Sequence, residues 1–311
     1  MFKILALSIV SVIYADYLGG YSGSGQRYTT NAREMSLGNS ITSEYNQGFN
    51  AFSNPALLYK SQDLEIGSSY FMMSLDRSVQ AFSVTRKLPP SAGASLSFFR
   101  SGVDNIIGKG FVNEGTGKFD SSESYLMLSF GASIANSLSL GFNLKSIFNS
   151  IDDYDAQGLS GDFGLIFNLS DELILSWVAN NFFGKYNWSS ITSSSGEFEE
   201  SLQMINSFGV MVGVFDNMKF FSKLSYMNPE KNNLYRIQAG AEFDRDRYVL
   251  RFGAMQNRGI KNDDSFNFKI LLGAGTYINV FKDYKIKLDY CIDLGKEEEG
   301  ISNLFSLSFI R

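Results

Sequence analysis

Histidine is absent from the 311 residues, and the chain has a single cysteine, Cys291. Without histidine the protein lacks the commonest general base and metal ligand, and a Ser–His–Asp triad is impossible. One cysteine can form neither an intramolecular disulfide nor a cysteine-cluster metal site. The sequence also contains no phosphate-binding loop or dinucleotide fingerprint. We therefore expect no enzymatic activity, no metal and no cofactor.

Proline is scarce, with 4 residues, and no apolar run in the mature chain reaches the ~18 residues of a membrane-spanning helix. The formal net charge of -5 argues against a general nucleic-acid binder. By contrast, Phe (28) and Tyr (16) are abundant, which is typical of β-strands. The composition shows no break, so we expect one large β-domain.

The first fifteen residues have the pattern of an export signal. Lys3 precedes the apolar run Ile4–Ile13, and Tyr14-Ala15 follows it. This arrangement is typical of a secretory signal peptide cut after Ala15, and the run is too short to span a membrane as a helix. We expect residues 1–15 to be removed and the mature protein to be exported.

Residues 16–62 lack any strand rhythm. They begin with a Gly/Ser-rich piece at residues 19–25, which predicts irregular structure. Asn54 followed by Pro55 is a good N-cap and first-turn pair, so we expect a short helix through about Lys60. We interpret residues 16–62 as a plug and residues 63–311 as a β-barrel, for the following reasons.

The stretch Leu138–Ile151 shows the pattern that dominates the rest of the chain. Leu138, Leu140 and Phe142 alternate with Ser139, Gly141 and Asn143. Such a two-residue period predicts a β-strand, because successive side chains point to opposite faces.

The same alternation predicts fourteen strands after residue 63. Most have about 9–12 residues, the length that a tilted strand needs to cross a bilayer. The predicted strands are Leu64–Leu75, Arg77–Arg86, Ala92–Val103, Ser124–Ala135, Leu138–Ile151, Leu159–Leu169, Leu173–Asn181, Asn206–Val214, Met218–Met227, Leu234–Phe243, Arg247–Gln256, Phe266–Tyr277, Tyr284–Ile292 and Ile301–Ile310.

The connections between these strands alternate between long and short. Asp104–Glu123 and Phe182–Ile205 are long, for example, whereas Asn136-Ser137 and Phe215–Asn217 are tight. Outer-membrane barrels show this asymmetry, with short periplasmic turns and longer external loops. A β-sandwich or β-propeller does not account for strand length and loop asymmetry together. We therefore predict a 14-stranded antiparallel transmembrane β-barrel, with both chain ends and the plug on the short-turn side.

Charged side chains must occupy the lumen face of these strands, because a cation facing lipid near the midplane costs about 2–4 kcal/mol. Two interpretations of this basic lumen stay open. The cations pair with plug carboxylates such as Glu34 and Glu44, or they attract an anion such as a fatty-acid carboxylate or an acidic segment of a partner. By parity the lumen-facing charged residues are Lys145, Asp162, Lys219, Lys223, Arg236, Glu242, Arg251, Lys269, Lys285, Lys287 and Asp289.

Acidic residues gather in the predicted external loops, where charge runs are usually solvated. No spacing among them marks a calcium loop. These residues are Asp120, Glu123, Asp153, Asp155, Glu197, Glu199 and Glu200.

Three segments, at residues 32–39, at Asn54–Leu58 and at Leu138–Asp162, together resemble the PorV/PorQ family of outer-membrane proteins, which belongs to the wider FadL-like group of fourteen-stranded barrels. Residues 32–39 (AREMSLGN) are similar to the family's Ala-Arg…Leu-Gly opening. Asn54-Pro55-Ala56, followed by Leu57-Leu58, resembles its Asn-Pro-Ala element, which lies in the N-terminal hatch of FadL-like barrels. Leu138–Asp162 resembles its central strand–loop–strand. The resemblance extends over most of residues 27–190.

The resemblance implies a non-enzymatic outer-membrane component of type IX-like secretion, which would serve protein export or the surface attachment of cargo. Its expected partners are outer-membrane lipid and secretion-machinery or cargo proteins. The alternative, implied by the FadL-like relatives, is a channel for hydrophobic solutes that the plug gates, with a hydrophobic or anionic ligand in the lumen. Both readings place the mature protein in the outer membrane of a Gram-negative-type bacterium, and neither involves nucleic acid.

Overall fold

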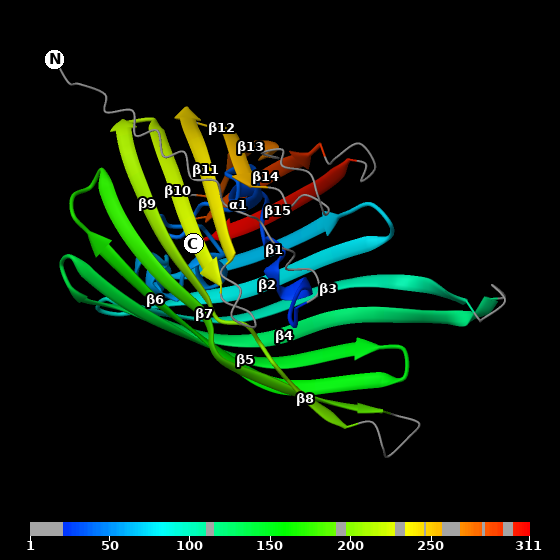
Figure 1. The fold of residues 1–311 in the computed structure, drawn as a ribbon. Coiled ribbons are helices and arrows are strands. Elements are labelled where there is room, and N and C mark those ends of the chain that lie inside the picture. The colour runs from blue at the N-terminus through cyan, green and yellow to red at the C-terminus, as the bar shows by residue number, and fades with distance from the viewer. Residues whose placement is uncertain are drawn as a thin grey trace.

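The computed structural model describes residues 21–109, 115–190, 197–227, 234–245, 247–256, 268–281, 284–294 and 301–311. The predicted signal peptide, residues 1–15, lies outside them. The described chain forms one closed antiparallel β-barrel around a short N-terminal segment (Figure 1). Within this part of the chain, no helix has both the length and the apolar character needed to cross a membrane.

The described part of the barrel wall contains fifteen strand segments, connected mostly as simple hairpins. They are β1 (Leu64–Met72), β2 (Arg77–Leu88), β3 (Ala92–Lys109), β4 (Gly115–Ala135), β5 (Leu138–Ile151), β6 (Tyr154–Asn168), β7 (Leu173–Ser190), β8 (Phe198–Ser201), β9 (Ile205–Phe215), β10 (Met218–Met227), β11 (Leu234–Arg245), β12 (Tyr248–Gln256), β13 (Phe268–Phe281), β14 (Tyr284–Asp293) and β15 (Ser302–Ile310).

Two pairings close the barrel. The first strand, β1, pairs with the last, β15, and β6 pairs with β7. β8 and β9 both pair with β7, one after the other, and together they form a single interrupted strand. The fifteen segments therefore occupy fourteen strand positions, which confirms the predicted 14-stranded antiparallel barrel.

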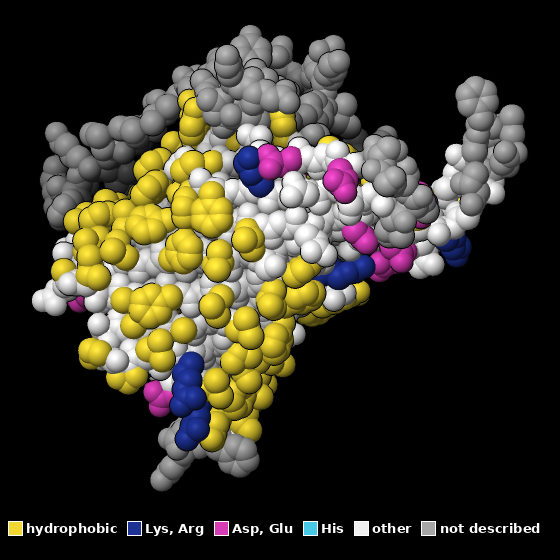
Figure 2. Space-filling model, turned by 90° about the horizontal axis from the view of Figure 1, so that it is seen from below, with side chains coloured by type: hydrophobic (Ala, Val, Ile, Leu, Met, Phe, Trp, Pro, Cys, Tyr) yellow, Lys and Arg dark blue, Asp and Glu magenta, His cyan; other side chains and the backbone are white. Residues whose placement is uncertain are grey.

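The distribution of side chains across the wall is the reverse of that in a soluble protein. Apolar residues such as Leu128, Phe252 and Phe305 are exposed on the outside, whereas charged residues such as Arg251 and Lys287 are buried inside. Figure 2 shows apolar side chains gathered over the outer wall. An apolar outer band around a polar interior is the pattern of a transmembrane barrel, because lipid tails satisfy no polar group.

The hairpins at one end of the barrel differ from the prediction. The sequence predicts long loops at residues 104–123 and 182–205, but β3 and β4 pair as far as Lys109 and Gly115, and β7 extends to Ser190. The predicted loop at 152–158 reduces to Asp152-Asp153, because β5 and β6 pair up to Ile151 and Tyr154. Backbone hydrogen bonds between neighbouring strands do not require apolar side chains. The strands therefore extend beyond the residues whose apolar alternation predicts them.

We call this end the long-hairpin mouth and the opposite end, with turns such as Asn136-Ser137 and Asp216-Asn217, the short-turn mouth. The first hairpin, residues 73–76, is short although it lies at the long-hairpin mouth. This arrangement matches the alternation of connections that the sequence predicts.

Within residues 21–62, the N-terminal segment has four short helical elements. They are η1 (Gly25–Arg27), α1 (Ala32–Ser36), α2 (Asn50–Ser53) and η2 (Pro55–Lys60). The predicted helix after Asn54 is confirmed as η2, a 3-10 helix, and the Asn54 side chain accepts a hydrogen bond from the backbone N–H of Ala56 at 2.9 Å. The helix α1, whose N-cap is Asn31, is not predicted from the sequence.

Candidate functional site

The N-terminal segment, which we call the plug (residues 21–62), lies inside the barrel and runs between its two mouths. η1 lies against Ser101 and Glu123, toward the long-hairpin mouth, where Glu123 accepts a hydrogen bond from Gly25 N–H at 3.1 Å. η2 packs on β2–β6 near the short-turn mouth. The plug thus extends along the lumen from the short-turn side, where the sequence places it, toward the long-hairpin mouth. Glu123, expected in a solvated loop, is a wall residue of β4 that holds the plug.

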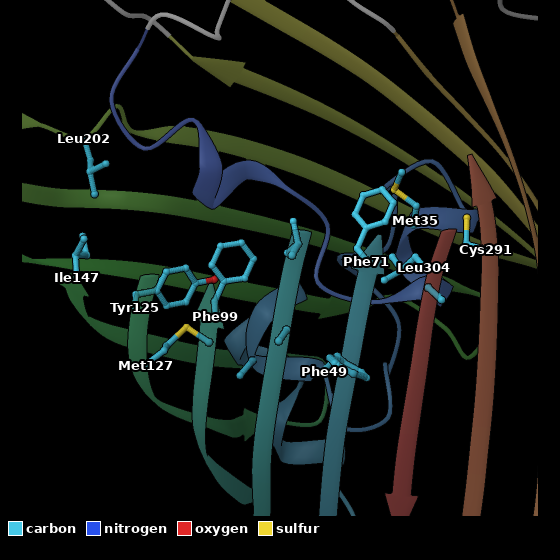
Figure 3. Close-up of a cluster of buried hydrophobic side chains, with 14 of the residues drawn as sticks. Met35, Phe49, Phe71, Phe99, Tyr125, Met127, Ile147, Leu202, Cys291 and Leu304 are labelled. Carbon is cyan, nitrogen blue, oxygen red and sulfur yellow. The ribbon is translucent and has the colours of Figure 1, made fainter. Parts of the chain in front are cut away.

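Buried apolar side chains seal the plug against one side of the wall. Met35 of α1 and Phe49, just before α2, belong to a cluster with the inward side chains of Phe71, Phe99 and Tyr125 (Figure 3). The rings of Phe99 and Tyr125 are stacked, with centroids 4.9 Å apart. This packing gives the plug a hydrophobic anchor inside the barrel.

Asn54, Pro55 and Ala56 fasten the plug near the short-turn mouth. Besides capping η2, the Asn54 side chain donates hydrogen bonds to the backbone oxygens of Thr42, at 2.9 Å, and Leu165, at 3.2 Å. One amide therefore connects two parts of the plug to β6. Asn54, Pro55 and Ala56 are all buried.

The backbone of η2 approaches the wall so closely that two wall positions require glycine. A Cβ on Gly141 would lie 2.2 Å from the backbone nitrogen of Ala56, and one on Gly131 would lie 2.1 Å from the carbonyl oxygen of Pro55. Real Cβ atoms do not approach backbone this closely. The missing side chains at Gly131 on β4 and Gly141 on β5 thus leave the space that the backbone of η2 occupies.

A chain of ion pairs holds the other side of the plug. Arg33 of α1 donates two hydrogen bonds to Glu242 on β11, at 2.7 and 2.8 Å. Glu242 also accepts from Arg251 on β12 at 2.7 Å, and Arg251 donates to Asp289 on β14 at 2.7 Å. Lys287 lies 3.4 Å from Asp289. All five side chains are buried, so each charge depends on its neighbours for compensation.

Two plug residues show how the lumen affects charge. Burial by itself lowers the pKa of Arg33, but the Glu242 carboxylate outweighs burial and raises this pKa above its usual value. Among the described residues, Glu34 has no lysine or arginine within hydrogen-bond distance. Burial raises the pKa of Glu34, and the positive charge of Lys223 and hydrogen bonds from Ser53 and Asn31 only partly oppose this.

A second ionic cluster lies on β5–β7. Lys145 donates to Asp162 at 2.8 Å, and Asn143 donates to the other oxygen of Asp162 at 2.9 Å. The backbone N–H of Asn181 donates to Asp162 at 3.0 Å, at the point where the β6–β7 register shifts. Lys145 also lies 5.2 Å from the ring centroid of Tyr125. Asp162 therefore compensates a cation and supplies a hydrogen-bond acceptor where the regular ladder is interrupted.

The other predicted lumen residues have different environments. Lys219 pairs with Glu44 of the plug at 3.4 Å, and Lys269 pairs with Asp293. Lys285 is exposed near the end of β14 at the short-turn mouth. The two remaining predicted cations, Lys223 and Arg236, border a cavity.

This cavity lies between the plug and the wall strands β4–β12 and has a volume of about 170 Å³. Four basic and two acidic side chains border it, together with several aromatic ones. The charged lining residues are Arg27, Glu34, Lys145, Asp162, Lys223 and Arg236, and the aromatic ones are Tyr28, Phe52, Tyr125, Tyr226 and Tyr235.

The chemistry of these residues is that of binding. The lumen offers cations, amides, hydroxyls and aromatic rings, and the lone Cys291 is buried beside β15. In the described part of the chain, no three acidic or cysteine side chains gather as a metal site would require. The roles of the amides Asn143 and Asn181 are not predicted from the sequence, because an uncharged polar residue at a lumen position gives no distinctive signal.

No protein-family model matches the sequence, and no curated protein is detectably similar to it. Solved structures do match. The CymD monoaromatic hydrocarbon channel has a TM-score of 0.66 at 12% identity over 90% of this chain and 96% of that chain. The Pseudomonas putida toluene transporter TodX has a TM-score of 0.66 at 13% identity over 91% and 98%.

A Pseudomonas aeruginosa FadL homologue has a TM-score of 0.58 at 12% identity, over 91% of this chain and 98% of that chain. At these identities the similarity establishes a shared FadL-like barrel fold and leaves function to be argued separately. The titles of these three matched structures name a channel, a transporter and a FadL homologue, and they give the PorV/PorQ resemblance no specific support.

Proposed function

We propose that the protein is a non-enzymatic outer-membrane channel for small hydrophobic solutes, with the plug as its gate. The observation that carries this proposal is the cavity inside a lipid-facing barrel, bordered by the plug on one side and by aromatic and polar wall residues on the other. A pre-formed cavity of mixed aromatic and polar lining is typical of small-molecule sites. The FadL-like fold supports the same role, since matched structures are titled as hydrocarbon and toluene transporters.

The secretion role implied by the PorV/PorQ resemblance remains a prediction, and finding secretion-machinery or cargo proteins that co-purify with the barrel would favour it. The buried plug gives no argument for that role. Its contacts are made with the barrel of the same chain, through Arg33, Asn54 and the apolar cluster around Phe49.

Uptake by cells tests the channel directly. We expect a bacterial host that carries the full-length protein in its outer membrane to take up radiolabelled toluene faster than the same host with an empty vector. Equal uptake, at matched and correctly folded protein levels, would contradict the proposal.

The plug is tested by replacing Asn54, which connects η2 to the wall. Loss of an N-cap costs about 1 kcal/mol, enough to shift an opening equilibrium about fivefold. Asn54→Ala is therefore expected to raise the leakage of small solutes from liposomes containing the barrel. Asn217→Ala, at an exposed asparagine in the turn between β9 and β10, is the matched control and should leave leakage unchanged. Equal leakage from both variants would show that this contact does not hold a gate.

A further inference from the structure

The cavity contains two cations for which the described residues provide no ion-pair partner. Among the other charged lining residues, Lys145 pairs with Asp162, and Arg27 donates to the backbone oxygens of Tyr21 and Ser22. Lys223 and Arg236, in contrast, form neither a hydrogen bond nor an ion pair with any carboxylate in the described part of the chain.

Strand register places these two cations close together. Lys223 on β10 is paired with Gln238 on β11, and Arg236 is two residues from Gln238 on the same strand. Both therefore project from the same face of the wall, as diagonal neighbours roughly 7–8 Å apart at the backbone. The nearest acidic influence on Lys223 is Glu34, whose carboxylate accepts hydrogen bonds from Asn31 and Ser53.

Two neighbouring cations in a partly buried cavity favour an anionic ligand. Removing a charge from water is costly unless an opposite charge compensates it, and two like charges repel each other. A guanidinium presents a planar pair of donors that matches a carboxylate, and a lysine ammonium adds a second, adaptable donor. A carboxylate bound between Arg236 and Lys223 would compensate both.

The remaining lining suits a ring. Tyr28 and Phe52 of the plug border the cavity, and so does the buried ring of Tyr125 on β4. The volume of about 170 Å³ is comparable to the engineered cavity of ~150 Å³ that binds benzene. A benzene ring carrying one carboxylate therefore fits the cavity in both size and chemistry.

We propose that this cavity is a binding site for small aromatic carboxylates, with the carboxylate on Arg236 and Lys223 and the ring among Tyr28, Phe52 and Tyr125. The inference rests on the proposed channel function and names its substrate class. It also differs from the neutral hydrocarbons named in the titles of the matched structures.

Equilibrium dialysis of the purified full-length barrel in detergent, with radiolabelled benzoate, tests the site without requiring transport. Toluene is the neutral comparison, since it has the same ring without the charge. We expect saturable benzoate binding that weakens as salt is raised, and weaker binding of toluene. Toluene bound as tightly as benzoate, or benzoate binding that does not respond to salt, would overturn the proposal.

Two single substitutions test whether Arg236 and Lys223 bind the carboxylate. Arg236→Gln and Lys223→Gln remove one charge each and should weaken benzoate binding by about ten- to a hundredfold, the usual effect of losing a hydrogen bond to a charged group. Lys285→Gln removes an exposed charge at the end of β14 and should bind benzoate as the wild type does. Equal loss in all three variants, or loss in none, would overturn the assignment.

Folding and function are separated by two further readouts. Heat-dependent migration on gels and circular dichroism report whether each variant forms the barrel, and Lys223→Met offers a second substitution if Lys223→Gln does not fold. If the purified barrel binds benzoate but cells take up neither toluene nor benzoate, the channel is refuted and the binding site stands. Toluene uptake without benzoate binding would refute the binding site and leave the channel standing.

Discussion

At the residue scale, Gly141 shows how closely the plug is fitted to the wall. Its missing side chain leaves room for the backbone of Pro55 and Ala56, which would lie 2.2 Å from an added Cβ. The contact joins backbone to backbone, so no side chain can rotate away to relieve it. A methyl group at this position must displace either η2 or β5.

We therefore predict that Gly141→Ala destabilises the barrel by about 1–3 kcal/mol, the usual cost of overpacking. Gly213→Ala is the matched control, because its Cβ would meet nothing nearer than 3.6 Å. Unfolding in urea, followed by tryptophan fluorescence, measures the difference. Equal stability of the two variants would mean that η2 can move away from Gly141 at no cost in stability.

Glu34 should make stability depend on pH in a specific direction. Its pKa is raised above the ordinary 4.5 by burial, so above pH 4.5 the folded state binds more protons at this site than the unfolded state does. The contribution of Glu34 to stability therefore falls as pH rises above 4.5, until its folded pKa is passed. Lys223, Asn31 and Ser53 face this carboxyl and reduce the effect without reversing it.

The corresponding prediction concerns Glu34→Gln. The difference in Tm between this variant and the wild type should shift in favour of the variant as the pH is raised from 4.5. Thermal unfolding in detergent at several pH values measures it, and a difference in Tm that does not vary with pH would contradict a raised pKa. The comparison with the wild type cancels the titrating groups that do not interact with Glu34; Lys223 does interact with it.

At the element scale, the strands were far more predictable than the plug. Alternation in residues such as Leu138–Ile151 predicts β-strands because one face of each meets lipid or an apolar surface, whatever the partner strands are. The parity of β14 likewise predicts that Lys287 and Asp289 face the lumen, and both are buried there. Strand ends were less predictable, because β3, β4 and β7 continue beyond the apolar pattern.

The plug was predictable only where a local signal exists. Asn54-Pro55 marks the start of η2, since capping depends on adjacent residues. The path of residues 21–53 depends instead on distant contacts, such as Arg33 with Glu242 and the N–H of Ala32 with Ser306. Pairing across more than 200 positions leaves no periodicity that a sequence alone could reveal, and the same is true of the cavity beside Lys223.

At the scale of the whole molecule, the outer wall determines the environment in which the barrel is stable. Leu128 on β4 is paired with Leu96 on β3 and with Leu144 on β5, and the three leucines form an exposed row across these strands. Leu169 is equally exposed, at 60% against 61%, but it lies beside the short turn after β6. The two leucines therefore differ mainly in their distance from the end of the barrel.

This difference leads to a matched prediction. An arginine facing lipid costs about 2–4 kcal/mol at the midplane and about 0–1 kcal/mol near the interface. Leu128→Arg should therefore reduce the stability of the barrel in phospholipid vesicles much more than Leu169→Arg, as measured by reversible unfolding in guanidinium. Similar losses in both variants would show that the row around Leu128 does not lie at the midplane.

The threaded plug has a consequence for how the barrel is assembled. The barrel closes where β1 meets β15, and bringing such distant segments together carries a large loop-closure entropy. The plug contacts both sides of this closure, since η2 packs on β2–β6 and α1 packs on β12–β15. A plug that associates early with both halves would hold the first and last strands close together before they pair. Residues 21–62 would then act first as a folding template and only afterwards as the occupant of the lumen.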